Sequence, residues 1–264
     1  MKGFILAAGV VTLTVCSVHA DGVDDFVRAA ITRRHIPGVA IAVVKNGTVV
    51  RIAGYGLADR EQNVVPGLHT VFRIGSLSKQ FIASGIMVLV QDRTIALSDP
   101  VTTFIPEVPQ TWRDITIRHL LTHTAGLPRE APAADLTRAK ADIELIRSAY
   151  RVQLQWKPGD KYAYSNLGYY ILAEVMTRVS GTPWSDPPGG HVTGVPMIRH
   201  EGTIPGFRPG FTRLPKQGLT IIVLTNLDRG AVDAIIAGIA IRYAPELIPH
   251  ALRQWTDKEA LGLQ

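Results

Sequence analysis

Ser76-Leu77-Ser78-Lys79 is the stretch that decides the fold and the chemistry of this chain, because it places a hydroxyl and an amine three residues apart. Residues i and i+3 share one face of a helix, so Lys79 can reach the Ser76 hydroxyl if a helix begins at or just before Ser76. Apolar residues from Phe81 to Val90 favour that helix. Ser76 is then a candidate nucleophile, a desolvated Lys79 its candidate base, and a backbone N–H of the first turn can hold an oxyanion.

A plain surface turn, with Ser76 as a helix cap and Lys79 in solvent, is the alternative that this motif alone leaves open. Motifs that would indicate a different enzyme class are missing from the sequence. No serine has the Gly-x-Ser-x-Gly surround of a nucleophile elbow. No Walker loop, Gly-x-Gly-x-x-Gly or His-Glu-x-x-His occurs either, which argues against phosphate, dinucleotide and zinc-peptidase sites.

The start of the chain predicts export. Lys2, the apolar run from Phe4 to Val15 and the small residues before Asp21 are typical of a signal peptide over residues 1–20. The run is shorter than the roughly 20 residues that cross a bilayer, so we expect no membrane span after its removal. Cys16 is the one cysteine of the chain, and lipid attachment there is disfavoured by the bulk of Val15. We therefore expect a periplasmic or secreted protein without disulfides.

Charge argues against a nucleic-acid partner. The formal net charge is +6, but the lysines and arginines are scattered along the chain. We expect a small-molecule or peptide substrate instead, and the sequence does not indicate an oligomeric state.

Patterning predicts strands at both ends of the chain and helices between them. A helix from Asp24 to His35 ends at Pro37-Gly38, and an Asn46-Gly47 turn predicts a hairpin. The further expected elements are helices at Ile82–Gln91, Ile117–Thr122, Ile143–Arg151, Leu167–Ser180 and Ala231–Tyr243, with Gly126 and Gly181 as stop signals, and strands at Val39–Val44, Val49–Tyr55, Gly210–Leu214 and Leu219–Asn226.

This order predicts an α/β fold with a discontinuous α/β domain, residues 21–75 and 197–264, interrupted by a mainly helical region, residues 76–196. Ser76 stands where the first part passes into the helical one. Boundaries between layers are frequent pocket locations, so we expect the site at this seam.

Two more segments carry groups suited to acyl transfer. Tyr164 and Asn166 flank a polar turn before a helix; the phenol can share a proton with Ser76, and the amide can orient a substrate carbonyl and a neighbouring lysine. Alone, this turn would be an ordinary helix N-cap. Farther on, Gly202 allows close approach and the Thr203 N–H is a candidate second oxyanion donor, with His200 as a polar or cationic wall.

Together the three segments resemble the serine β-lactamase, DD-peptidase and esterase superfamily, most closely its class C-like branch. Ser76-x-x-Lys79 is similar to the nucleophile motif, Tyr164-x-Asn166 to the second box, and His200-x-Gly202 to the third box, with histidine where β-lactamases usually carry lysine. Flanking sequence agrees, with Phe72-Arg73-Ile74-Gly75, His119 to Pro128, and Gly206-Phe207. The resemblance implies a β-lactamase-like fold, an antiparallel sheet flanked by helices with a helical insert domain.

The resemblance further implies an exported serine hydrolase that forms an acyl-enzyme on a β-lactam, D-peptide or short carboxylic ester. Ser76, Lys79 and Tyr164 are the expected catalytic residues, and Asn166, His200, Gly202 and Thr203 the substrate-binding ones. Lys79 and Tyr164 would titrate as a coupled pair, so the sequence does not decide which is the base. A non-catalytic envelope binding protein derived from the same family is the alternative.

Two departures from the family bear on the site. The segment 182–199 before His200 is short and rich in proline and glycine, which predicts a more open pocket. Glu201 stands where relatives commonly have a small or hydroxylated residue, and its carboxylate would repel substrate carboxylates if it faced the pocket. No cofactor is expected. His119 and His123 have an i, i+4 spacing that suits a metal, but no third ligand is suggested and the resemblance gives their segment a loop-shaping part.

Overall fold

The computed structural model describes residues 22–135, 137–138, 140–181 and 199–245, and all structural statements below concern these residues. The predicted signal peptide and most of the short segment before His200 lie outside them. The elements are α1 (Val23–Arg33), β1 (Gly38–Lys45), β2 (Thr48–Gly56), α2 (Ser78–Gln91), α3 (Ile117–Leu121), α4 (Asp142–Ser148), α5 (Asn166–Ser180), β3 (Arg199–Glu201), β4 (Arg208–Leu214), β5 (Leu219–Thr225) and α6 (Val232–Tyr243), with four short 3₁₀ turns, η1 (Gly75–Leu77), η2 (Val101–Thr103), η3 (Gln110–Trp112) and η4 (Pro215–Gln217).

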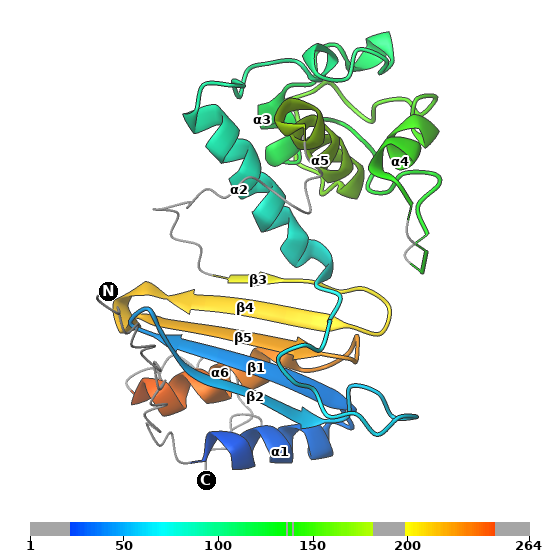
Figure 1. The fold of residues 1–264 in the computed structure, drawn as a ribbon. Coiled ribbons are helices and arrows are strands. Elements are labelled where there is room, and N and C mark those ends of the chain that lie inside the picture. Colours follow the sequence, from blue (N-terminus) through cyan, green and yellow to red (C-terminus); the bar gives the residue numbers. More distant parts are fainter. Residues whose placement is uncertain (1–21, 136, 139, 182–198, 246–264) are drawn as a thin grey trace, which may run out of the picture.

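Five antiparallel strands form one sheet in the order β2-β1-β5-β4-β3. Strands from the two ends of the chain meet where Ile41 of β1 pairs with Val223 of β5. Alternate residues of β5 are buried, as expected of a sheet covered on one face. The covering helices are α1 and α6 (Figure 1). Their residues Phe26 and Ile235 belong to the hydrophobic core that these helices form with the strands.

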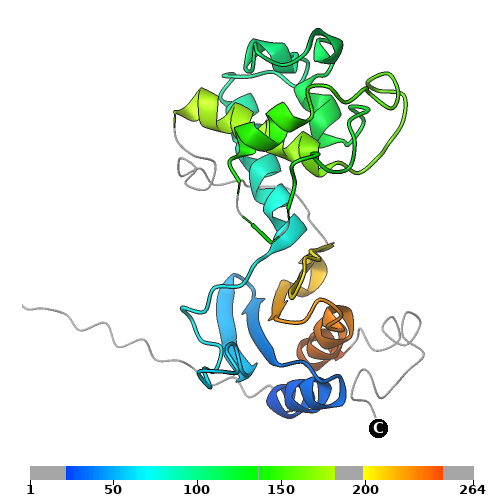
Figure 2. The same cartoon turned by 90° about the vertical axis from the view of Figure 1, so that its right-hand side faces the viewer.

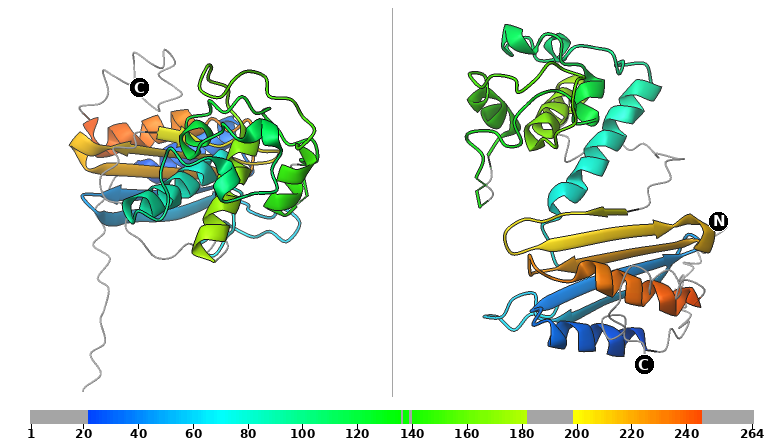
Figure 3. Two further views of the ribbon diagram at one scale, coloured as in Figure 1. Left: turned by 90° about the horizontal axis from the view of Figure 1, so that it is seen from above. Right: turned by 180° about the vertical axis from the view of Figure 1, so that it is seen from behind.

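A second hydrophobic core lies among the helices, away from the sheet. It contains Ile86 of α2, Leu120 of α3, Leu172 of α5 and the fully buried Trp112. Figures 1 and 2 both place α3, α4 and α5 beyond the β3 edge of the sheet, with α2 reaching from that edge into them. The views from above and behind show the same two-part arrangement (Figure 3). The predicted antiparallel sheet with flanking helices is therefore confirmed.

Most predicted elements agree with the structure to within a few residues. The hairpin turn has positive φ at Asn46 (50°) and Gly47 (81°), as a tight two-residue turn requires. Gly181 ends α5 in the left-handed conformation, φ 72°. The helix expected to reach Arg151 ends at Ser148. Among the described residues, no helix is both long and apolar enough to span a membrane.

The prediction that Gly126 stops a helix is wrong. α3 ends at Leu121, and Gly126 lies in the following loop with φ 75°. A Cβ at this position would clash with the Trp156 carbonyl oxygen. Glycine is needed there because two loop segments approach closely, not because a helix ends.

Candidate active site

Ser76 sits in the 3₁₀ turn η1, which runs directly into α2. The Lys79 ammonium lies 3.3 Å from the Ser76 hydroxyl oxygen, within hydrogen-bond distance. The local geometry expected from the Ser-x-x-Lys spacing is thus present, and Lys79 faces the nucleophile candidate instead of solvent.

Tyr164 reaches Ser76 from 88 residues farther along the chain. Its phenol oxygen is 2.6 Å from Ser76 Oγ, closer than the Lys79 nitrogen. The residue after it, Ser165, caps α5 by accepting from the Gly168 N–H and donates its own hydroxyl to the Pro128 carbonyl. The cap fixes the turn that carries Tyr164.

Asn166, the first residue of α5, also contacts Lys79. The Lys79 ammonium donates to Asn166 Oδ1 at 2.5 Å, and Asn166 Nδ2 donates to Glu130 Oε1 at 2.6 Å. Lys79 also lies 4.8 Å above the centre of the Tyr164 ring, a favourable cation–π position. Four predicted site residues, Ser76, Lys79, Tyr164 and Asn166, therefore converge in space.

His123 supports the Tyr164 ring. The two rings stack with centroids 4.5 Å apart, and His123 Nδ1 accepts from the Ser165 N–H at 3.1 Å. Burial, and then the positive charge of Lys79, lower the pKa of His123 to about 4. The other histidine of the i, i+4 pair, His119, accepts from the Thr116 N–H in a capping box at the start of α3. Both Nδ1 atoms therefore have structural partners.

The end of β3 packs against the nucleophile turn through two glycines. A Cβ on Gly202 would lie 2.5 Å from the Ile74 carbonyl oxygen and 3.1 Å from the Ser76 nitrogen. Gly75 has φ +50°, and a Cβ there would stand 3.6 Å from the Thr203 nitrogen. The N–H groups of Ser76 and Thr203, the two candidate oxyanion donors, are thus brought to the same region, as the close approach expected at Gly202 requires.

The other two residues of this segment are His200 and Glu201. The backbone of His200 pairs with Phe211 in the edge strand β3, while its side chain lies outside what the structure describes. Glu201 accepts from an Arg208 guanidinium N–H at 2.9 Å, so its charge is paired. It is also absent from the described lining of the pocket, and the repulsion expected from its carboxylate is therefore not supported.

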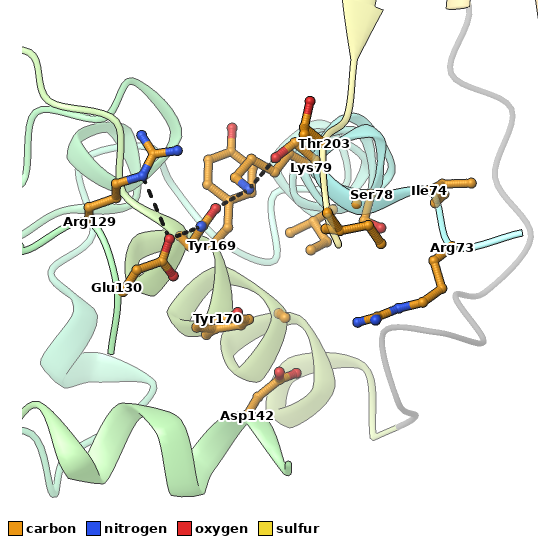
Figure 4. Close-up of a pocket in the computed structure, with 16 residues that line it drawn as sticks. Arg73, Ile74, Ser78, Lys79, Arg129, Glu130, Asp142, Tyr169, Tyr170 and Thr203 are labelled. Carbon is orange, nitrogen blue, oxygen red and sulfur yellow. Dashed lines mark hydrogen bonds and ion pairs between the residues drawn. The ribbon is translucent and has the colours of Figure 1, made fainter. Parts of the chain in front are cut away.

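A pocket of about 420 Å³ lies at the seam between the sheet edge and the helices. Its lining includes Ser76, Lys79, Asn166, Thr203 and Glu130. Tyr164 and Gly202 are not among its described lining residues, although Tyr164 contacts Ser76 directly. Figure 4 shows Arg129 and Glu130 together on one side of the pocket, and Arg73 and Asp142 away from them on its rim. The rim therefore carries charges of both signs.

Sequence reasoning missed Arg129 and Glu130. They directly follow the family-like segment from His119 to Pro128, and this proximity was the one signal in the sequence that pointed to them. An adjacent Arg-Glu pair is otherwise typical of a solvated loop. The structure places Glu130 in the site by two observations: it lines the pocket, and it accepts from Asn166, 36 residues away.

The low pKa of His123 predicts a stability change with pH. Between about pH 6.5 and 4 the unfolded chain binds a proton that the folded chain does not, so the free energy of unfolding falls as pH is lowered through this window. Asparagine tolerates the positive φ of 58° at position 123. We expect the free energy of unfolding of His123→Asn to fall by about 2 kcal/mol less than that of the wild type when the pH is lowered from 7 to 4.5. Urea unfolding of both proteins at several pH values measures this difference, and parallel curves would contradict it.

Comparison with known proteins matches residues 23–195 to the family model described as Beta-lactamase. Protein flp of Staphylococcus aureus (strain COL) is 30% identical over 164 residues, which is 60% of this chain and 33% of that protein. The chain thus spans about a third of the length of this curated relative. The match concerns the family as a whole, and assignment to the class C-like branch stays a prediction.

Solved structures show the same fold. A D-amino acid amidase from Ochrobactrum anthropi SV3 aligns with a TM-score of 0.67 at 17% identity, covering 88% of this chain and all of the other (100%). A beta-lactamase/D-alanine carboxypeptidase from Pseudomonas syringae aligns with a TM-score of 0.67 at 15% identity, covering 84% of this chain and 97% of the other. At these identities the likeness concerns the fold.

Proposed function

The chain belongs to the beta-lactamase family, and on that premise we propose that it is an exported serine hydrolase that acts through an acyl-enzyme on short, polar amide or ester substrates. The observation that carries the proposal is the Ser76 hydroxyl, held 2.6 Å from the Tyr164 phenol and 3.3 Å from the Lys79 amine. A nucleophile and a base within hydrogen-bond reach, with the base oriented by a third group, are the parts that covalent catalysis needs.

In the proposed reaction Ser76 Oγ attacks the substrate carbonyl carbon while its proton passes to the Lys79 and Tyr164 pair. The N–H groups of Ser76 and Thr203 stabilise the oxyanion. When the tetrahedral intermediate collapses, the carbon–nitrogen or carbon–oxygen bond breaks and the amine or alcohol leaves with that proton. Water then attacks the acyl-enzyme, loses a proton to the same pair, and releases the carboxylic acid with Ser76 restored.

Support for a polar substrate comes from the pocket rim, which carries Arg73 and Arg129 as well as Glu130 and Asp142. Such a rim suits compounds that carry an amino group or a carboxylate near the scissile bond better than long apolar esters. D-amino-acid amides and short D-peptides have this character, as do β-lactams. Residues 1–20 are the basis for proposing that the protein works outside the cytoplasm.

A panel of three chromogenic substrates tests the proposal on purified protein: a D-amino-acid p-nitroanilide, p-nitrophenyl acetate and a chromogenic cephalosporin. We expect turnover of at least one, together with covalent labelling by a fluorophosphonate probe. The relative kcat/KM values assign the substrate class. Absence of both turnover and labelling in folded protein would contradict a hydrolase and favour the non-catalytic binding protein.

A further inference from the structure

We propose that Glu130 is a positioning residue for acyl transfer: its carboxylate fixes the amide of Asn166 so that the oxygen, and not the NH₂ group, faces Lys79. This inference rests on the proposed function. It concerns a residue outside the three motifs, and it is carried by the chain of contacts from Glu130 Oε1 to Asn166 and on to Lys79. Figure 4 shows Glu130 and Lys79 at the two ends of this chain.

The orientation of the amide follows from the charges at its two ends. An ionised carboxylate only accepts hydrogen bonds, and a lysine ammonium only donates them. Asn166 must therefore turn its NH₂ toward Glu130 and its oxygen toward Lys79. A flipped amide would place oxygen against carboxylate and NH₂ against ammonium, which makes both contacts repulsive.

The orientation matters most when Lys79 acts as a base. A neutral amine has two N–H groups and a single lone pair. If Asn166 offers its oxygen, one Lys79 N–H is used there and the lone pair remains for the Ser76 hydroxyl, 3.3 Å away. If Asn166 offered its NH₂ instead, the lone pair would accept from it, and the amine could not take the Ser76 proton.

The backbone holds Glu130 in register with Asn166. The Asn166 N–H donates to the Arg129 carbonyl at 2.7 Å, and the Ser165 hydroxyl donates to the preceding Pro128 carbonyl at 2.7 Å. The Arg129 guanidinium lies 3.7 Å from Glu130 Oε1, on the same oxygen that accepts from Asn166. The other oxygen, Oε2, is buried without a hydrogen-bond partner among the described residues. One oxygen thus performs the positioning.

Glu130→Gln tests this directly, because glutamine has the same shape but can present either end of its amide. We expect kcat and the rate of fluorophosphonate labelling to fall together by about tenfold, with KM within twofold of wild type and an unchanged melting temperature. Glu144→Gln, an exposed residue of α4, is the matched control and should label at the wild-type rate.

A second test exchanges the carboxylate at position 130 and the amide at position 166. Its expected result differs from that of a purely structural role for Glu130. Asn166→Asp alone sets two carboxylates against each other and should label slowly. In the double variant Glu130→Gln/Asn166→Asp, the introduced glutamine amide can donate to one oxygen of the introduced carboxylate, whose other oxygen accepts from Lys79, so both contacts are attractive again. We expect this double variant to label about tenfold faster than Asn166→Asp alone.

Three results would overturn the inference: Glu130→Gln labels as fast as wild type, its only kinetic change is a higher KM, or the double variant labels no faster than Asn166→Asp alone. A higher KM with unchanged kcat would identify Glu130 as a substrate contact instead. Failure of the proposed function is separate, because in that case the wild-type protein would itself not label.

Discussion

Replacing Ser76 by alanine is expected to abolish turnover of every substrate that the protein accepts. The Ser76 hydroxyl is the group that both the Tyr164 phenol and the Lys79 amine contact, so its removal leaves these partners without a nucleophile to activate. Loss of a nucleophile in other serine hydrolases costs several powers of ten in kcat, and we expect a fall of roughly 10⁴-fold or more. Steady-state kinetics on the best substrate of the panel measures it.

The matched control for this variant is Ser98→Ala, an exposed serine beyond the far end of α2. It should keep wild-type kcat and KM. Ser76→Ala should also melt near the wild-type temperature, because the change removes one partly buried hydroxyl and no core packing. Residual turnover above about one per cent of wild type in folded Ser76→Ala would assign the chemistry to another residue.

Lys79→Met is expected to have the second-largest effect. Methionine keeps most of the apolar stem but removes the amine that bridges Ser76 and Asn166. General-base assistance is typically worth about 10²–10⁴-fold, and loss of the cation beside Tyr164 also disturbs the phenol, so we expect kcat/KM to fall by roughly 10³-fold. The initial rate of fluorophosphonate labelling should fall by a similar factor.

Lys157→Met is the control, since Lys157 is exposed in a loop. Its labelling rate should equal that of wild type. If Lys79→Met kept more than a tenth of the wild-type labelling rate, Tyr164 would be sufficient as the base, and the role proposed for the lysine would be wrong.

The local half of the site could be predicted from sequence because it depends on helix periodicity alone. Ser76 and Lys79 are one turn apart, so any helix beginning there brings them together. The pairs β1–β2 and β4–β5 were predictable for a similar reason, since β-rich runs joined by short turns specify hairpins locally, whereas the pairing of β1 with β5 joins the two ends of the chain and has no local signal. Convergence of Tyr164 on Ser76 has no local signal, and it was expected only from the family resemblance.

What escaped prediction depends on contacts between distant segments. Glu130 acquires its role from Asn166, and Gly126 acquires its conformation from Trp156. Neither partner is visible in the sequence around these residues, where a charged pair and a glycine are ordinary loop features. The stacking of His123 on Tyr164 is of the same kind: the resemblance gave its segment a loop-shaping part, but the residue on which the ring packs lies in a distant loop.

Peptide mapping of the fluorophosphonate adduct tests the central claim most directly. After reaction of the wild-type protein, digestion and tandem mass spectrometry should locate one adduct, on Ser76, with a stoichiometry approaching one per chain. An adduct on a different serine, or complete inhibition with Ser76 unmodified, would contradict the account.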